Sequence, residues 1–273
     1  MPGTTLASTT SMFSLDAYAP REIAHRVQTI GVRKAEMPLS QMLALAGLAG
    51  AFIALGAVFY TVVVTGSTLG FGLTRLLGGL SFCLGLVLVV LAGAELFTGN
   101  NLVAMAWASR RVSTFGLLRS WGLVYLGNAV GALFVVGLVV LAETAGLAEG
   151  GVGEVAVAIA RSKCALAPAT AFARGVLCNT LVCLAVWLAM GGHTFTDKFF
   201  AVLFPITAFV AAGFEHSIAN MFFLPWGISV SGDASLIAPA FANLFWVTLG
   251  NIVGGSVLVA GTYWTVYLRH DPA

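Results

Sequence analysis

The chain has 273 residues, of which 59% are hydrophobic and only 9% are charged, and its mean hydropathy is +0.97. Soluble domains carry about a quarter charged residues, so this composition excludes an ordinary soluble protein and indicates a membrane protein. The net charge is +2 and the basic residues form no long cluster, so we do not expect nucleic-acid binding.

The N-terminal region contains one candidate helix before the apolar sequence begins. Residues 1–19 are rich in Ser and Thr and have no apolar core, so we do not interpret them as a signal peptide. Residues 21–37 place Ile23, Val27 and Ile30 at helical spacing among basic side chains. This pattern predicts an amphipathic helix on an anionic membrane surface.

Six long, charge-poor segments follow, and each is long enough to cross a bilayer, which takes about 20 apolar residues. We expect an all-α polytopic membrane protein with spans at roughly 39–66, 74–108, 114–142, 165–191, 198–228 and 237–268. The predicted divisions of the chain are a cytoplasmic N-terminal segment, a six-helix channel domain and a cytoplasmic tail, at 1–38, 39–268 and 269–273.

The second and fifth spans contain the same polar pattern. One is Gly93-Ala-Glu95-Leu-Phe-Thr98-Gly-Asn100, and the other, 120 residues later, is Gly213-Phe-Glu215-His216-Ser-Ile-Ala-Asn220. An ionisable residue inside a membrane span suggests a functional site. The Gly and Asn residues predict a break in each helix, which is tolerated where the backbone is buried or lines a cavity.

A second pair of matching segments shows that the duplication is wider. Leu126-Gly-Asn128-Ala-Val-Gly131 in the third span matches Leu249-Gly-Asn251-Ile-Val-Gly254 in the sixth. Each half therefore has three spans, and an odd number predicts two inverted repeats with a site at their interface. The small residues predict close helix contact between halves or between subunits.

The basic residues indicate the orientation of the spans. With both termini in the cytoplasm, most Lys and Arg residues fall on that side, as the positive-inside rule requires. These are Arg21, Arg26, Arg33, Lys34, Arg110, Arg111, Arg119, Lys198 and Arg269, against Arg75, Arg161, Lys163 and Arg174 on the outer side. We expect a multi-pass protein of the cytoplasmic (inner) membrane.

Polar residues within the spans are the candidates for function. His216 is the one histidine of four that falls inside a span, and it can donate a hydrogen bond to an anion or exchange a proton with it. The alternative is a structural histidine. Thr98 and Asn179 can join its network, although Thr and Asn also bridge membrane helices.

The remaining polar residues have roles nearer to structure. We expect Glu95 and Glu215 to hold the broken loops by accepting backbone N–H bonds, with Asn100 and Asn220 serving the same end. Lys163 either raises the local anion concentration at a vestibule or snorkels at the interface. Arg174 lies deeper and needs a partner, which the sequence does not identify.

No residue pattern indicates catalysis, a metal or a cofactor. The four cysteines, Cys83, Cys164, Cys178 and Cys183, form no Cys-x-x-Cys pair, and helix packing explains them. No second histidine within a span completes a ligand set, and no nucleophile pairs with a base. We therefore expect neither an enzyme nor a metalloprotein.

Three segments together closely resemble the formate/nitrite transporter family. They are Gly93–Asn100, Gly175–Trp187 and Gly213–Met221, and the resemblance extends over residues 30–268. It implies an aquaporin-like protomer, a homopentamer with one pore per protomer, and His216 as the central histidine with Thr98 and Asn179 as its partners. It also implies Lys163 as the vestibule lysine and four constriction residues: Phe82, Leu86, Phe97 and Phe209.

These observations predict a channel or carrier for a small monovalent weak-acid anion, namely formate, coupled to protonation at His216. Nitrite, hydrosulfide or lactate transport by the same mechanism is the alternative. A water or glycerol channel is less favoured, because the Asn-Pro-Ala motifs expected at its helix breaks are absent. A membrane redox enzyme would need paired histidines or a cysteine cluster within the spans.

Overall fold

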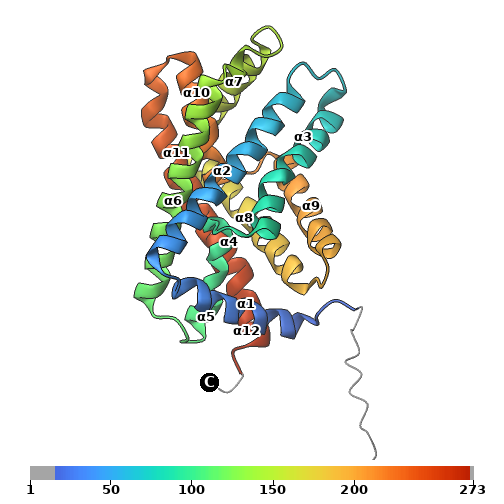
Figure 1. The fold of residues 1–273 in the computed structure, drawn as a ribbon, viewed down its shortest axis with the longest axis vertical. Helices are drawn as coiled ribbons and strands as arrows, with labels where there is room; N and C mark the ends of the chain where they lie inside the picture. Colours follow the sequence, from blue (N-terminus) through green and yellow to red (C-terminus); the bar gives the residue numbers. More distant parts are fainter. Residues whose placement is uncertain (1–15, 271–273) are drawn as a thin grey trace, which may run out of the picture.

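The structure is a computed structural model that describes residues 16–270, and every regular element in this range is helical. Six helical segments are long and apolar enough to cross a membrane, which confirms the predicted polytopic fold. They are Leu39–Val64, Gly70–Gly93, Thr114–Leu141, Pro168–Gly191, Phe195–Ala212 and Ala234–Tyr267. Figure 1 shows them packed side by side in one bundle.

The two halves of the chain contain corresponding elements. The first half comprises α1 (Pro20–Ala35), α2 (Leu39–Val64), α3 (Gly70–Val87), the π-helical turn η1 (Leu88–Gly93), α4 (Phe97–Asn100), η2 (Asn101–Val103), α5 (Ala104–Ala108), α6 (Thr114–Leu141) and η3 (Thr144–Gly146). The second comprises α7 (Gly151–Cys164), α8 (Pro168–Gly191), α9 (Phe195–Ala212), α10 (Ser217–Ser231), η4 (Ala234–Leu236), α11 (Ile237–Ile252), the π-helical η5 (Val253–Gly261) and α12 (Thr262–Tyr267).

The second and fifth spans are interrupted, as predicted. Gly93 has φ +86° and Gly213 has φ +75°, a left-handed conformation that glycine adopts without steric cost. The backbone then runs extended, with Leu96 at φ −104° and His216 at φ −111°, before α4 and α10 begin. Each break therefore presents backbone and side chains to the interior of the bundle.

The small residues of the Leu-Gly-Asn segments make close contacts within each half, so the expected contact between halves or subunits is corrected. Helix α6 packs on α2, and α11 packs on α8. A Cβ atom on Gly131 would overlap the carbonyl oxygen of Gly47, and one on Gly254 would overlap that of Val176. The absence of side chains lets the paired backbones touch.

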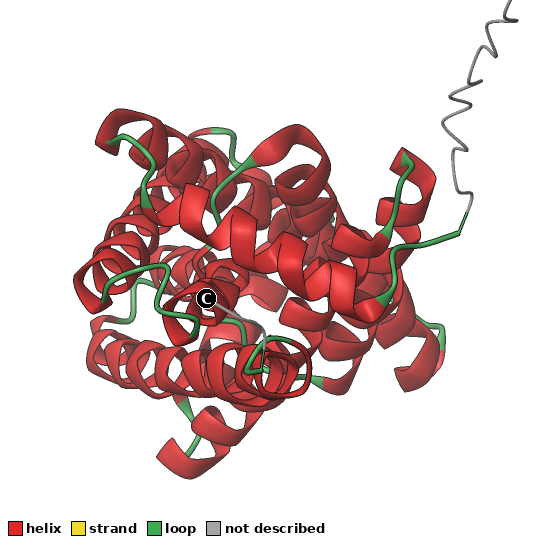
Figure 2. Ribbon diagram, turned by 90° about the horizontal axis from the view of Figure 1, so that it is seen from below, coloured by secondary structure: helices red, strands yellow, loops and turns green. Residues whose placement is uncertain are grey.

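Helix α1 lies across one end of the bundle, close to α12 and to the last described residues (Figure 1). Seen from below, it is the helix that follows the grey N-terminal trace and crosses the near face (Figure 2). Its buried side chains Ile23 and Val27 pack in a cluster with Leu102, Met105 and Trp187. The apolar face predicted from the sequence thus packs against the protein.

Helix α7 falls in residues 143–164, the segment between the predicted third and fourth spans, for which the sequence predicts no helix. It lies at the end of the bundle opposite α1 and packs mainly on α10 (Figure 1). Small residues such as Ala156 and Ala160 are fully buried on its inner face. Lys163 consequently lies in the last turn of this helix.

Candidate pore with two repeat-related ion pairs

The two helix breaks bring Thr98 and His216 together in the middle of the bundle. Thr98 Oγ1 lies 3.0 Å from His216 Nε2, and both residues are buried. His216 Nδ1 accepts a hydrogen bond from the N–H of Ala219 at 3.1 Å, so this nitrogen carries no proton. The hydrogen-bond network therefore assigns the neutral tautomer in which Nε2–H donates to Thr98.

Aromatic and aliphatic side chains surround this polar pair. The Phe209 ring stacks on the His216 ring, with 5.9 Å between centroids, and Phe82 meets Phe209 edge to face at 5.7 Å. Leu86, one helical turn after Phe82 on α3, is buried on the side of the pair that faces α1. The structure does not place Phe97 with these residues, because its ring packs against Trp121 and Tyr125.

A cavity lies on each side of these apolar residues. The cavity at the α1 end of the bundle, named the inner cavity from here on, has a volume of about 410 Å³ and is lined by Lys34, Glu95 and Leu86. The cavity at the α7 end, named the outer cavity, has a volume of about 360 Å³ and is lined by Lys163, Glu215 and His216 among others. The arrangement is that of two charged vestibules separated by an apolar barrier with one polar pair in it.

At the inner cavity, Lys34 of α1 binds the carboxylate of the first break. Its Nζ donates to Glu95 Oε1 and Oε2 at 2.9 and 3.0 Å and to Asn100 Oδ1 at 2.8 Å. Asn100 Nδ2 donates to Glu95 Oε2 at 2.7 Å. Lys34 is not among the predicted site residues, because its sequence pattern indicates a helix on the membrane surface.

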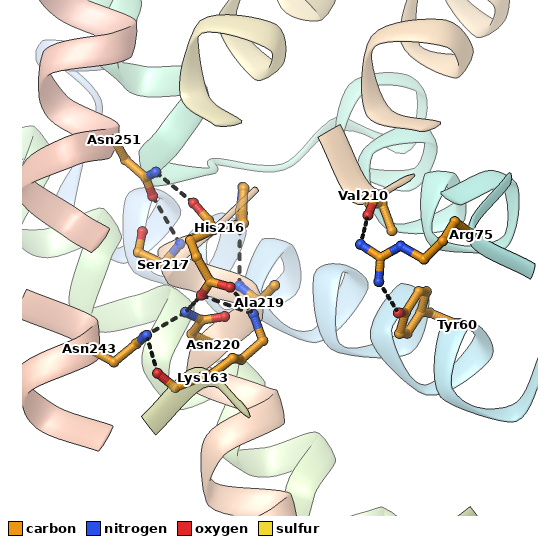
Figure 3. A network of polar contacts seen from close by, with 11 residues as sticks. Tyr60, Arg75, Lys163, Val210, His216, Ser217, Ala219, Asn220, Asn243 and Asn251 are labelled. Carbon is orange, nitrogen blue, oxygen red and sulfur yellow. Dashed lines mark hydrogen bonds and ion pairs between the residues drawn. The ribbon is translucent and has the colours of Figure 1, made fainter. Parts of the chain in front are cut away.

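At the outer cavity, Lys163 of α7 makes the corresponding ion pair. Its Nζ donates to Glu215 Oε1 and Oε2 at 2.9 and 3.0 Å, and Asn220 Nδ2 donates to Glu215 Oε2 at 2.7 Å. Asn243 joins the group by donating to the carbonyl of Lys163 and accepting from Asn220 (Figure 3).

The expected bonds from backbone N–H groups to the two carboxylates are therefore wrong. Each carboxylate instead accepts bonds from a lysine and an asparagine side chain. A carboxylate buried to this degree is stabilised best by an opposite charge with additional hydrogen bonds. The cation in each case comes from a helix outside the break.

Two other asparagines hold the break loops, and they belong to the repeated Leu-Gly-Asn segments. Asn128 accepts from the N–H of Phe97 at 2.9 Å and donates to the carbonyls of Ala46 and Glu95. Asn251 accepts from the N–H of Ser217 at 2.9 Å (Figure 3) and donates to the carbonyls of Gly175 and Glu215. Each amide thus satisfies backbone groups that the break leaves outside a helix.

Asn179 supports Thr98 rather than His216. Its Nδ2 lies 3.2 Å from the Thr98 carbonyl and 2.7 Å from Asn101 Oδ1 and the Asn251 carbonyl. Cys183 Sγ also contacts the Thr98 carbonyl at 3.3 Å. The structure therefore brings Asn179 to the same network without a direct bond to the imidazole.

The end of α9 before the second break is held by Arg75 of α3. Its Nε donates to the carbonyl of Ala211 at 2.9 Å. Its Nη2 donates to the carbonyl of Val210 at 2.6 Å and its Nη1 donates to Tyr60 (Figure 3). A cation at helix C-terminal carbonyls is favourable for the helix dipole. Arg75 therefore stabilises the half-helix that leads to His216.

Among residues 16–270, no group of three or more His, Cys, Asp or Glu side chains could hold a metal ion. The polar groups at the centre can instead donate hydrogen bonds to a small solute. The cavities on both sides carry basic side chains.

The sequence matches the family model described as formate/nitrite transporter over residues 21–265. It is 40% identical to the formate channel FocA of Escherichia coli (strain K12), over 94% of this chain and 96% of that protein. It is 41% identical to a probable formate transporter of Methanothermobacter thermautotrophicus, over 92% of this chain and 97% of the relative.

Solved structures have the same architecture. A pentameric formate channel with formate bound matches with a TM-score of 0.79 and 40% identity, covering 85% of this chain and 98% of that one. A channel described as an FNT family ion channel matches with a TM-score of 0.79 and 30% identity, covering 90% of this chain and 98% of that one.

Proposed function

Because this chain belongs to the formate/nitrite transporter family, we propose that it is a transmembrane channel for a small monovalent weak-acid anion, with formate as its substrate. The relatives that it resembles are named as channels or transporters, consistent with a protein that is not an enzyme. Nitrite, hydrosulfide and lactate fit the same mechanism and remain the alternatives.

The observation that carries the proposal is the His216–Thr98 pair, enclosed by apolar side chains and flanked by cavities that carry basic residues. A bare anion passing Phe82, Leu86 and Phe209 would lose its hydration without a full replacement, which is strongly unfavourable. The neutral acid loses far less hydration free energy on the same path. We therefore infer that the solute crosses the barrier as the protonated acid.

Coupling to protonation at His216 is part of the proposal, and the tautomer defines the step. The imidazole takes a proton at Nδ1 and gives up its bond from the Ala219 N–H. The Nε2 proton then passes to Thr98 Oγ1 as the threonine hydroxyl proton passes to the anion, which leaves as the neutral acid. The histidine ends neutral and can regain its starting tautomer.

We propose that the channel is a homopentamer with one pore per protomer in the cytoplasmic membrane. The support is the pentameric state named for one matching structure. Large apolar side chains such as Phe115, Phe134, Phe204 and Phe241 face outward on the spans and suit lipid or a neighbouring subunit. The described chain ends lie at one end of the bundle, which fits both termini on the cytoplasmic side (Figure 1).

Formate uptake into proteoliposomes across a pH series tests this function. We expect uptake to rise as the outer pH falls and to dissipate an imposed pH gradient. His216→Phe should form a folded oligomer with lost or altered proton-coupled uptake. Unchanged uptake and unchanged pH dependence in this variant would contradict the mechanism, and parallel assays of nitrite, hydrosulfide and lactate would rank the substrates.

A further inference from the structure

Three basic side chains line the outer cavity, and they differ in what they bind. They are Arg75, Lys163 and Arg174. The electrostatic attraction of an anion depends on the charge that remains after internal pairing. The partners of each cation therefore decide which one is available to an incoming solute.

Two of these cations are engaged with the protein. Lys163 lies within 3.0 Å of both carboxylate oxygens of Glu215, so the pair carries no net charge. Arg75 donates from Nε and both terminal nitrogens to Tyr60 and to the end of α9. An anion bound at either side chain would compete with contacts that hold the second break, although Arg75 bonds only neutral groups and keeps its charge.

Arg174 differs from both. It is half-buried on α8, and its backbone carbonyl accepts a bond from the N–H of Glu215 at 3.2 Å, which fixes the residue at the mouth of the break. Across residues 16–270, no hydrogen bond or ion pair joins its guanidinium group to another side chain or carbonyl. Its donors are therefore available within the cavity that His216 and Phe209 also line.

We propose that Arg174 forms an anion-binding subsite in the outer cavity and that this subsite receives planar anions with two equivalent oxygens, such as a small carboxylate or nitrite. A guanidinium group presents two parallel N–H donors that match such an anion. The inference rests on the proposed function and refines it, since the anion is captured by Arg174 while Lys163 holds Glu215. The bound anion then lies in the same cavity as His216.

Formate, nitrite and hydrosulfide uptake by Arg174→Gln and Arg174→Lys tests the subsite. Arg174→Gln should raise the formate concentration for half-maximal uptake about tenfold, because a charge-assisted contact is lost, while maximal uptake stays near that of the unmodified protein. Arg174→Lys keeps the charge but loses the two parallel N–H donors. The concentrations of formate and nitrite for half-maximal uptake should therefore rise about threefold, while that of hydrosulfide, which has one acceptor atom, should stay the same.

The matched control is Arg161→Gln. Arg161 is exposed on α7 and lines a separate hollow with Glu154, so the variant makes the same charge change outside the outer cavity. It should leave uptake unchanged. If Arg174→Gln and the unmodified protein need the same formate concentration for half-maximal uptake, the subsite is overturned. It is also overturned if Arg161→Gln raises this concentration as much as Arg174→Gln does. Full recovery of formate and nitrite uptake in Arg174→Lys would overturn bidentate capture.

Two further measurements separate the possible failures. Size-exclusion elution identifies a variant that does not assemble. If Arg174→Gln fails to assemble, Arg174→Lys, which keeps the positive charge and a long aliphatic side chain, is compared with the unmodified protein instead. Broadening of the ¹³C-formate resonance by the solubilised channel reports binding without transport. Broadening that Arg174→Gln abolishes would support the subsite even if the unmodified channel passes no formate, whereas broadening that survives in Arg174→Gln would overturn it.

Discussion

The lysine–glutamate pairs have similar geometry in the two halves but lie at different depths. The side chain of Lys34 is 23% exposed and that of Lys163 is 14% exposed, while Glu95 and Glu215 are 8% and 5% exposed. Removing one partner of a buried pair leaves an uncompensated charge and destabilises more than removing both. The deeper outer pair should show this effect more strongly.

We predict that Lys163→Met lowers stability by about 3 kcal/mol, since it leaves Glu215 charged and unpaired in the outer cavity. The double variant Lys163→Met/Glu215→Gln should recover more than half of that loss. The apparent melting temperature of the solubilised channel, followed by tryptophan fluorescence, gives the comparison. A double variant no more stable than Lys163→Met would mean that the pair does not balance a buried charge.

Lys34 shows what the sequence could and could not reveal at this scale. Lys34 and Glu95 are 61 residues apart, and nothing local in α1 indicates that one of its cations points inward. The duplicated Gly-x-Glu pattern did offer a signal. If Lys163 pairs with Glu215, the inverted repeat predicts a second cation that pairs with Glu95 at the opposite end of the bundle. The sequence indicated that Asn179 belongs to the central network but did not identify the atoms that it contacts. The position of a residue within a span does not specify which atoms its side-chain amide reaches.

At the scale of elements, each helix break depends on an asparagine from a neighbouring span. Asn251 makes three bonds to the loop around His216 and to α8, and Asn128 makes three equivalent bonds around Thr98. Both amides are fully buried, so no solvent can replace them. The break geometry is thus imposed from outside the broken helix.

We predict that Asn251→Leu, which keeps the approximate size of the side chain, lowers formate uptake at least tenfold and reduces the melting temperature. The N–H of Ser217 and two carbonyls lose their partners, and each buried unsatisfied group costs about 1–3 kcal/mol. Thr180→Val is the control, since it removes a bond to Val176 within α8 and none to a break. Equal losses in both variants would show a general packing effect.

The breaks were predictable from Gly, Glu and Asn in otherwise apolar sequence, whereas helix α7 was not. Helix α7 has only 14 residues and includes charged residues, so it lacks the length of a span and resembles a loop by composition. Its tertiary contacts with α10 stabilise it, and such contacts are invisible in a single sequence. The Leu-Gly-Asn repeat is visible in the sequence as a pattern. The hydrogen bonds of its asparagines are not, because the break loop that each asparagine contacts lies about 30 residues away along the chain.

At the scale of the molecule, the inverted repeat means that the same arrangement of packed helices occurs in both halves. Span three lies against span one, and span six against span four, and each pair meets at glycines that have no room for a Cβ against the facing backbone. These contacts bring Asn128 and Asn251 within reach of the two breaks. The repeat predicted from sequence therefore couples helix packing to pore geometry in both halves.

This coupling predicts equal sensitivity of the two halves to one added methyl group. Gly131→Ala and Gly254→Ala would each place a Cβ against a carbonyl oxygen of the partner helix, in Gly47 and Val176 respectively. Backbone atoms cannot move aside as a side chain can, so the helices must separate and carry Asn128 or Asn251 away from its loop.

We expect both variants to yield little assembled channel by size-exclusion chromatography, and any that assembles to show reduced formate uptake. Gly137→Ala is the matched control on α6, because its Cβ would meet no atom within 4 Å. It should assemble normally, and replacing glycine in a helix should make it slightly more stable. Normal assembly and uptake in Gly131→Ala but not in Gly254→Ala would show that only the half bearing His216 needs the close contact, contrary to equivalent roles for the two repeats.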